Sequence, residues 1–113
     1  MTTMEQEPAA TLRGMAAGEL TEASPCARMA DVEESGLDAR VHALVRLAAL
    51  VALDAAPPSY ARLLPAALRS GATVDDVVAV LVALAPQVGE ARVVAGAERV
   101  VRVLDAAAVP GGA

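Results

Sequence analysis

The sequence predicts an all-α protein of five to six helices, and three observations lead to that prediction. Hydrophobic residues make up 56% of the 113 residues but aromatic residues only 1%, so the apolar content is alanine, valine and leucine. Alanine and leucine are strong helix formers, and alanine lets helices approach one another closely. The valine-rich runs lack the alternation of a strand and are bounded by helix caps, which leaves no segment that favours a sheet.

The first third of the chain predicts two helices. Residues 1–8 are polar and we expect a frayed start, followed by a short helix over residues 9–17 that ends at Gly18. A second, weakly amphipathic helix is predicted over residues 20–34. We therefore treat residues 1–34 as a region of N-terminal helices.

The middle of the chain predicts a third and a fourth helix. Asp38 can cap a helix over residues 39–54, which is apolar nearly all round and should be buried on most sides. The pair Pro57–Pro58 suits the first positions of a helix over residues 57–69. Pro65 should bend this fourth helix or mark a break in it.

Two further helices are predicted in the last part of the chain. Thr73 and Asp76 resemble a capping box, with Asp in place of the usual Glu, and introduce a helix over residues 74–85 that is apolar on every face. A break is expected at residues 86–89. The sixth helix is predicted over residues 90–106, with charged residues on its polar positions.

Charge and composition exclude several classes of partner. The net charge of −5, the pI of about 4.7 and the absence of Lys/Arg runs argue against binding to nucleic acid or to an anionic membrane. The most apolar runs, residues 47–53 and 77–86, are far shorter than the ~20 residues of a membrane-spanning helix. The N-terminus has Glu where a signal peptide has Lys or Arg, and the single Cys26 cannot form an internal disulfide. These features predict a cytoplasmic protein. One His and one Cys cannot assemble a metal site.

The segment from Ser35 to Val100 resembles the carboxymuconolactone decarboxylase and alkylhydroperoxidase (AhpD)-like superfamily. The residues that carry the resemblance are Leu37-Asp38 opening a helix, AALVAL at 48–53, AALRSGAT at 66–73 and VDDVVAVLVALA at 74–85. The resemblance implies an all-α, AhpD-like helical fold in a core over residues 35–106, a loose tail at 107–113, and assembly into trimers or hexamers. The two helices that are apolar all round also predict an oligomer.

The resemblance implies that this chain lacks the thiol centre of the peroxidase branch. In that branch a Cys-x-x-Cys pair begins a helix, and a His and an upstream Glu move protons. Those positions fall on Ala56 and Ser59 for the cysteines, on Leu63 for the histidine and on Ala43 for the glutamate. No redox cofactor is implied.

His42 and Arg46 are four residues apart and so share one face of the third predicted helix, with Asp38 one turn earlier. They could form a proton-transfer and anion-binding site, because histidine titrates near neutrality and arginine binds carboxylates. The alternative, which we favour, is a row of ion pairs at a subunit contact.

Ser59, Tyr60 and Arg62 lie in the first turns of the fourth predicted helix, where backbone N–H groups attract anions. They could hold a small organic acid. Alternatively, Ser59 caps the helix and Tyr60 packs with its hydroxyl in water. The candidates are therefore His42 and Tyr60 for catalysis, and Arg46, Ser59 and Arg62 for ligand binding.

The sequence thus predicts a non-redox, oligomeric helical protein that binds a small organic acid or serves as an assembly module. One alternative is an acid–base enzyme acting on a lactone or a small organic acid through His42, Arg46 and Tyr60. A further alternative is a residual peroxidase that uses Cys26.

Overall fold

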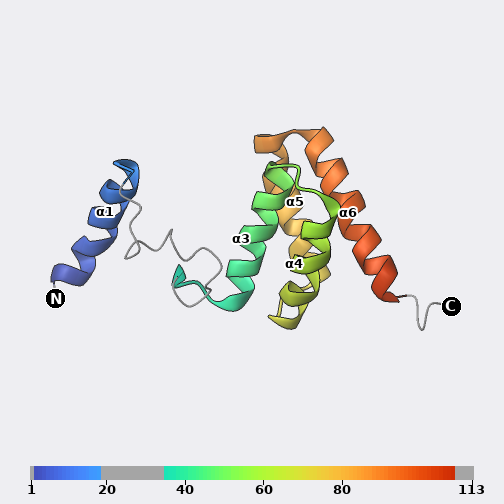
Figure 1. The fold of residues 1–113 in the computed structure, drawn as a ribbon, viewed down its shortest axis with the longest axis horizontal. Helices are drawn as coiled ribbons and strands as arrows, with labels where there is room; N and C mark the ends of the chain where they lie inside the picture. The colour runs from blue at the N-terminus through green and yellow to red at the C-terminus, as the bar shows by residue number, and fades with distance from the viewer. Residues whose placement is uncertain (1, 19–34, 109–113) are drawn as a thin grey trace. The chain divides into compact units, whose positions relative to one another are not determined.

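The structure, a computed structural model, describes residues 2–18 and 35–108 (Figure 1). Within these ranges every regular element is a helix, which confirms the all-α prediction. The helix expected over residues 20–34 and the end of the expected tail lie outside the described residues. None of the described helices is both long and apolar enough to cross a membrane.

Helix α1 (Thr2–Ala16) belongs to a compact unit of its own, residues 1–36. It begins at Thr2 rather than at Ala9 and includes Pro8. A proline inside a helix removes one backbone hydrogen bond, and the residues before Pro8 remain helical despite that loss. The chain leaves the helix at Gly18, as expected, where φ is 79°.

The second unit, residues 37–113, holds the other four helices. They are α3 (Ala39–Ala52), α4 (Pro57–Arg69), α5 (Val74–Val88) and α6 (Glu90–Ala108). Helix α3 packs against the three others, and α6 packs against both α4 and α5. Figure 1 shows α3 and α6 on either side of α4 and α5.

The interior of this unit is made of aliphatic side chains and one tyrosine. Its largest fully buried side chains are Leu47 and Val51 from α3 and Tyr60 and Leu64 from α4. Val77 of α5 completes this cluster together with a valine of α6. The core is therefore centred between α3 and α4. Because these buried side chains fix how the two helices are rotated, they also fix the direction of the remaining faces of α3 and α4.

The caps predicted for α3 and α5 are present. The carboxylate of Asp38 accepts a hydrogen bond from the backbone N–H of Val41 at 2.8 Å. Thr73 and Asp76 form the reciprocal capping box: Asp76 N–H donates to Thr73 Oγ1 at 3.0 Å, and Thr73 N–H donates to Asp76 Oδ2 at 2.9 Å. These bonds satisfy backbone donors that the first turns of the helices leave free.

Three helix ends of this unit differ from the prediction. Helix α6 runs to Ala108 rather than to residue 106, so residues 107 and 108 belong to the helix and not to a loose tail. Helix α3 ends at Ala52, because Leu53 is its C-cap and Asp54 adopts a positive φ of 53°. Helix α5 passes through the expected break at Pro86 and ends at Val88, with Gly89 as its C-cap. The break predicted over residues 86–89 is therefore wrong, and Gly89 alone separates α5 from α6.

The prediction that the apolar helices are buried on most sides does not hold within the single chain. Of the α5 residues only Val77 is fully buried, whereas Val78 and Val82 are 52% and 68% exposed. On α3, Val45 is 53% exposed. Each helix uses one face for the core and carries exposed valines that this unit does not cover.

Candidate functional site

A cavity of about 270 Å³ lies between α3 and α4. Arg46 lines it from α3, and Ser59 and Arg62 line it from α4. The three residues that the sequence predicts as ligand-binding residues therefore surround one cavity. Leu50, Leu63 and Ala66 complete its wall.

Helical periodicity explains why these residues meet. Ser59, Arg62, Leu63 and Ala66 are spaced i, i+3, i+4 and i+7, so they form one stripe on α4. Another face of α4, which includes Tyr60, enters the core. The core contacts of α4 direct this stripe toward α3. Residues 46 and 50 of α3 are four positions apart and therefore also share one helix face.

The two arginines of the cavity have no carboxylate partner among residues 8–18 and 35–108. Both side chains are exposed. By contrast, Arg40 pairs with Asp76, and Arg99 pairs with Asp54. Arg46 and Arg62 therefore retain free guanidinium donors, which suit the planar, bidentate recognition of a carboxylate.

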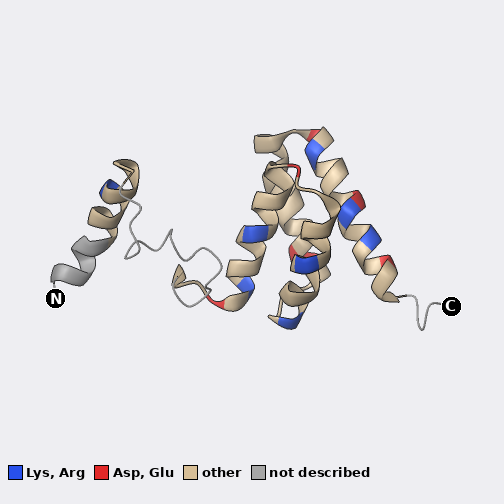
Figure 2. Ribbon diagram, viewed as in Figure 1, with Lys and Arg blue, Asp and Glu red and all other residues tan. Residues whose placement is uncertain are grey.

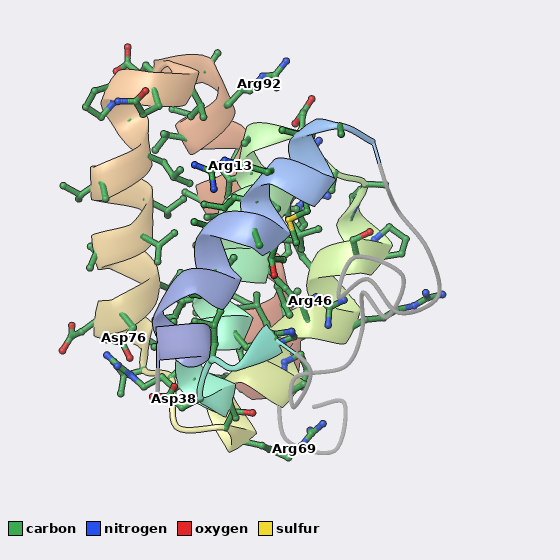
Figure 3. All side chains as sticks on the ribbon, turned by 90° about the vertical axis from the view of Figure 1, so that its left-hand side faces the viewer. Arg13, Asp38, Arg46, Arg69, Asp76 and Arg92 are labelled. Atoms are coloured by element: carbon green, nitrogen blue, oxygen red, sulfur yellow. The ribbon has the colours of Figure 1, made fainter. Side chains whose placement is uncertain are left out.

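The net negative charge of the chain does not come from the part that holds this cavity. Residues 35–108 contain seven Arg and seven Asp or Glu, so the net charge of −5 belongs to residues 1–34. Figure 2 shows basic and acidic residues interspersed along α6, whereas α3 and α4 carry arginines and no acidic residue. In Figure 3, Asp38 and Asp76 lie at one end of these helices and Arg92 at the other, with Arg46 between them. The cationic character of the cavity is therefore local to Arg46 and Arg62.

The rest of the cavity wall is apolar. Leu63 is buried, and Leu50 and Ala66 are half-buried. Ser59, also half-buried, contributes one hydroxyl that can donate or accept a hydrogen bond. The geometry suits a molecule whose acidic group meets the arginines and whose body lies on the leucines.

The start of α4 offers few free N–H groups for the anion binding that the sequence suggested. Pro57 and Pro58 occupy its first positions and have no N–H groups, and the N–H of Ser59 donates to the carbonyl of Ala56 at 3.0 Å. The cap residue is Ala56, so the interpretation of Ser59 as the cap is wrong. Any anion held in this cavity depends on side chains rather than on the helix terminus.

His42 and Tyr60 do not line this cavity. His42 is half-buried, one turn before Arg46 on α3. Asp38, considered above as its partner, caps α3 instead. The structure therefore does not bring the two candidate catalytic residues together with the three candidate ligand-binding residues.

Tyr60 is 0% exposed, so the expectation of a hydroxyl in water is wrong. Its hydroxyl has no hydrogen-bond partner of acceptable geometry among the described residues. Burial raises the pKa of Tyr60, and the nearby Arg99 guanidinium opposes that rise. The side chain acts as a core residue on the face of α4 that turns away from Arg62.

The apolar residues of the cavity were not predicted from the sequence as ligand-binding residues, although Leu63 falls at the position of the histidine of the peroxidase branch. Leu50, Leu63 and Ala66 look like ordinary core positions, because leucine and alanine fill helix interiors throughout this chain. The signal that was available is the spacing from Ser59, which places two of them on its stripe. Among residues 8–18 and 35–108 no three metal-binding side chains lie together.

Comparison with known families supports the resemblance carried by residues 35–100. The family model described as "Carboxymuconolactone decarboxylase family" matches residues 18–102. This match covers most of the chain and begins earlier than the segment recognised above. No curated protein and no solved structure matches the chain.

Proposed function

Because the chain belongs to the carboxymuconolactone decarboxylase family, we propose that it is a member that binds a small organic acid without thiol redox chemistry. The observation that carries this proposal is the cavity between α3 and α4, where Arg46, Ser59 and Arg62 meet above an apolar wall. Two guanidinium groups without carboxylate partners supply charge-assisted donors for an acid, and the leucines supply contact for its body.

The residues at the expected redox positions support binding rather than peroxide chemistry. Ser59 stands at the position of the second thiol and Leu63 at that of the histidine, and both line the cavity. A serine hydroxyl can hold an acid but does not cycle between thiol and disulfide, and an alkyl side chain carries no proton. The single cysteine of the chain, Cys26, has no second cysteine with which to form a disulfide.

We further propose that the protein acts as a homo-oligomer. Val45 on α3 and Val78 and Val82 on α5 are each more than half exposed. Val78 and Val82 are four residues apart and so share one face of α5, and exposed apolar patches mark interaction sites in soluble proteins. A second copy of the chain would remove these valines from water, at roughly 25 cal/mol for each Å² of apolar surface.

The binding proposal is tested by calorimetric titration with a panel of small carboxylates and their matched amides. We expect carboxylates to bind and amides not to bind. Arg46→Gln and Arg62→Gln should each weaken binding about 10- to 100-fold, the worth of one charge-assisted hydrogen-bonding group. Arg69→Gln is the matched control, because Arg69 is an exposed arginine of α4 that does not line the cavity.

Two outcomes would contradict the proposal. The first is that no carboxylate binds at millimolar concentration. The second is binding that survives both Arg46→Gln and Arg62→Gln. Light scattering on the Arg46→Gln variant distinguishes ligand binding from the alternative role of Arg46 in a subunit contact. If the variant loses the assembly but keeps its affinity for the acid, Arg46 belongs to an interface.

The non-redox part of the proposal has its own test. Thiol-dependent peroxide turnover should be absent, and Cys26→Ser should leave every measured property unchanged. Peroxide turnover that Cys26→Ser abolishes would show that the chain retains a thiol peroxidase function.

A further inference from the structure

A second groove, of about 330 Å³, lies between the start of α4 and the C-terminal half of α6. Pro57, Pro58 and Ala61 form its α4 wall, and Val103 lies on its α6 wall. Arg99 and Arg102 are the charged residues that line it. Its volume falls at the lower end of the range for small-molecule sites.

This groove is separate from the cavity between α3 and α4. The two share no lining residue. Pro58 and Ala61 lie on one face of α4, whereas Ser59 and Arg62 follow them by one residue each and lie on another. A ligand in the groove therefore has no contact with the site of the proposed function.

The wall of the groove selects for apolar surface. The two prolines have no backbone N–H, so the start of α4 offers a rigid apolar surface without donors. Ala61 and Val103 add only methyl groups. A ligand body that lies here makes van der Waals contacts and needs no hydrogen-bonding groups of its own.

The two arginines of the groove play different parts. Arg99 bonds to the carboxylate of Asp54, which fixes its guanidinium against the turn between α3 and α4. Arg102 lies one turn later on α6, is exposed, and has no carboxylate partner among residues 8–18 and 35–108. The groove therefore has one guanidinium that is already paired and one that is free.

The ion pair beside the groove carries no net charge, because the guanidinium of Arg99 is matched by the carboxylate of Asp54. An anion at the mouth of the groove is favoured by Arg102 and is not repelled by the Arg99–Asp54 pair.

From these observations we infer that the groove between α4 and α6 binds an amphipathic monocarboxylate, which is a compound with one acid group and an unbranched or flat apolar body. The carboxylate bonds to Arg102, and the body lies between the prolines of α4 and Val103. One free guanidinium matches a single acid group. Apart from Arg102, and from Arg99, which is paired with Asp54, the lining residues have no polar side chain, and this matches a ligand body without hydrogen-bonding groups.

The inference is tested with the full chain and with octanoate as the probe, by amide chemical-shift mapping. Octanoate should shift the amides of Ala61 and Val103, and Arg102→Gln should raise its dissociation constant about tenfold. Octan-1-ol, which has the same body without the charge, should bind at least tenfold more weakly. Arg69→Gln, at an exposed arginine of α4 that lines neither cavity, is the matched control and should leave these shifts and this affinity unchanged.

A second variant tests the groove without removing charge. Ala61→Phe places a ring between the two walls and should abolish the octanoate shifts in the groove. Each of three results would overturn the inference: shifts confined to Ser59 and Leu63, octanol binding as tightly as octanoate, or an affinity that Arg102→Gln does not change. Absence of octanoate binding at millimolar concentration, for instance because a second copy covers the groove, would overturn it as well.

Discussion

Arg40, in the first turn of α3, binds Asp76, in the first turn of α5, through two parallel hydrogen bonds. Arg40 Nε donates to Asp76 Oδ2 at 3.0 Å, and Nη2 donates to Oδ1 at 2.6 Å. The same carboxylate accepts the backbone N–H of Thr73. One side chain therefore joins the starts of two helices and completes the capping box of one of them.

These bonds predict a loss of stability in acid. The hydrogen bonds from Arg40 and then from Thr73 lower the pKa of Asp76 from 3.8 to about 2. Because the folded pKa lies below the unfolded one, the ionised carboxylate stabilises the fold above about pH 4. That contribution is lost as the pH falls from 4 toward 2. Urea unfolding between pH 6 and pH 2.5 should show this decline.

Asp76→Asn should flatten that decline, because the variant has no proton to bind at this position. Asp75→Asn is the matched control: it removes the same charge one residue away, and Asp75 is exposed with no ion-pair partner among the described residues. The pKa of Asp54 is also lowered by its bond to Arg99, so part of the slope should remain in Asp76→Asn. An unchanged slope in Asp76→Asn would contradict the assignment.

Gly96→Ala should destabilise the protein, although alanine is the better helix former by about 1 kcal/mol. A Cβ at Gly96 would lie 3.1 Å from Val51 Cγ2 and 3.3 Å from Val51 Cγ1. Val51 is 1% exposed and is held by the core. The methyl groups therefore cannot move without disturbing the packing of α3 against α6. Thermal unfolding of the variant should show a lower Tm.

The same substitution in a Val51→Ala background is the control. Removing the valine methyl groups leaves room for the new Cβ, so Gly96→Ala should then raise the Tm relative to Val51→Ala alone. A higher Tm for Gly96→Ala in the wild-type background would show that α6 does not approach α3 as closely as described.

Tyr60→Phe should leave stability unchanged or raise it by up to about 1 kcal/mol. The buried hydroxyl has no hydrogen-bond partner among the described residues, and removing an unsatisfied buried polar group relieves its desolvation cost. Tyr60→Ala removes the ring as well and should cost about 3–5 kcal/mol. Urea unfolding measures both. A loss of more than 1 kcal/mol in Tyr60→Phe would reveal a hydrogen bond of the hydroxyl, for which the Arg99 guanidinium, which already acts on the pKa of Tyr60, is the candidate donor.

Val82→Glu should dissociate the proposed oligomer. Val82 is 68% exposed on the outer face of α5, and a carboxylate there cannot be buried against a second copy without a large desolvation cost. Light scattering after gel filtration should give a multiple of the 11.4 kDa chain mass for the wild type and a lower mass for the variant.

Val101→Glu is the matched control, because Val101 is 51% exposed on α6 instead. It should leave the mass unchanged if α5 forms the contact. A wild-type mass of one chain would contradict the oligomer itself, and dissociation by Val101→Glu alone would move the contact to α6.

The helices and most of their limits could be predicted from the sequence, because the interactions that set them act over a few residues. The Asp38 cap reaches Val41, and the capping box joins Thr73 to Asp76. The prolines at the start of α4 restrict their own backbone φ angle to helical values and need no N–H partner, so they favour a helix start without distant contacts. The three ligand-binding candidates could also be named, since arginine and serine stand out on helices otherwise made of alanine, valine and leucine.

The sequence by itself determined the helix order and the stripe that carries Ser59 and Arg62. Only the tertiary structure decided what those side chains meet. Arg40 pairs with Asp76, 36 residues away in the sequence, and Arg99 pairs with Asp54, 45 residues away. Arg46 has no carboxylate partner among the described residues. The same packing turns Tyr60 into the core and brings Arg46 to the cavity. The physical reason is that local bonds set each helix, whereas pairing and burial depend on distances between helices that no spacing along the chain specifies.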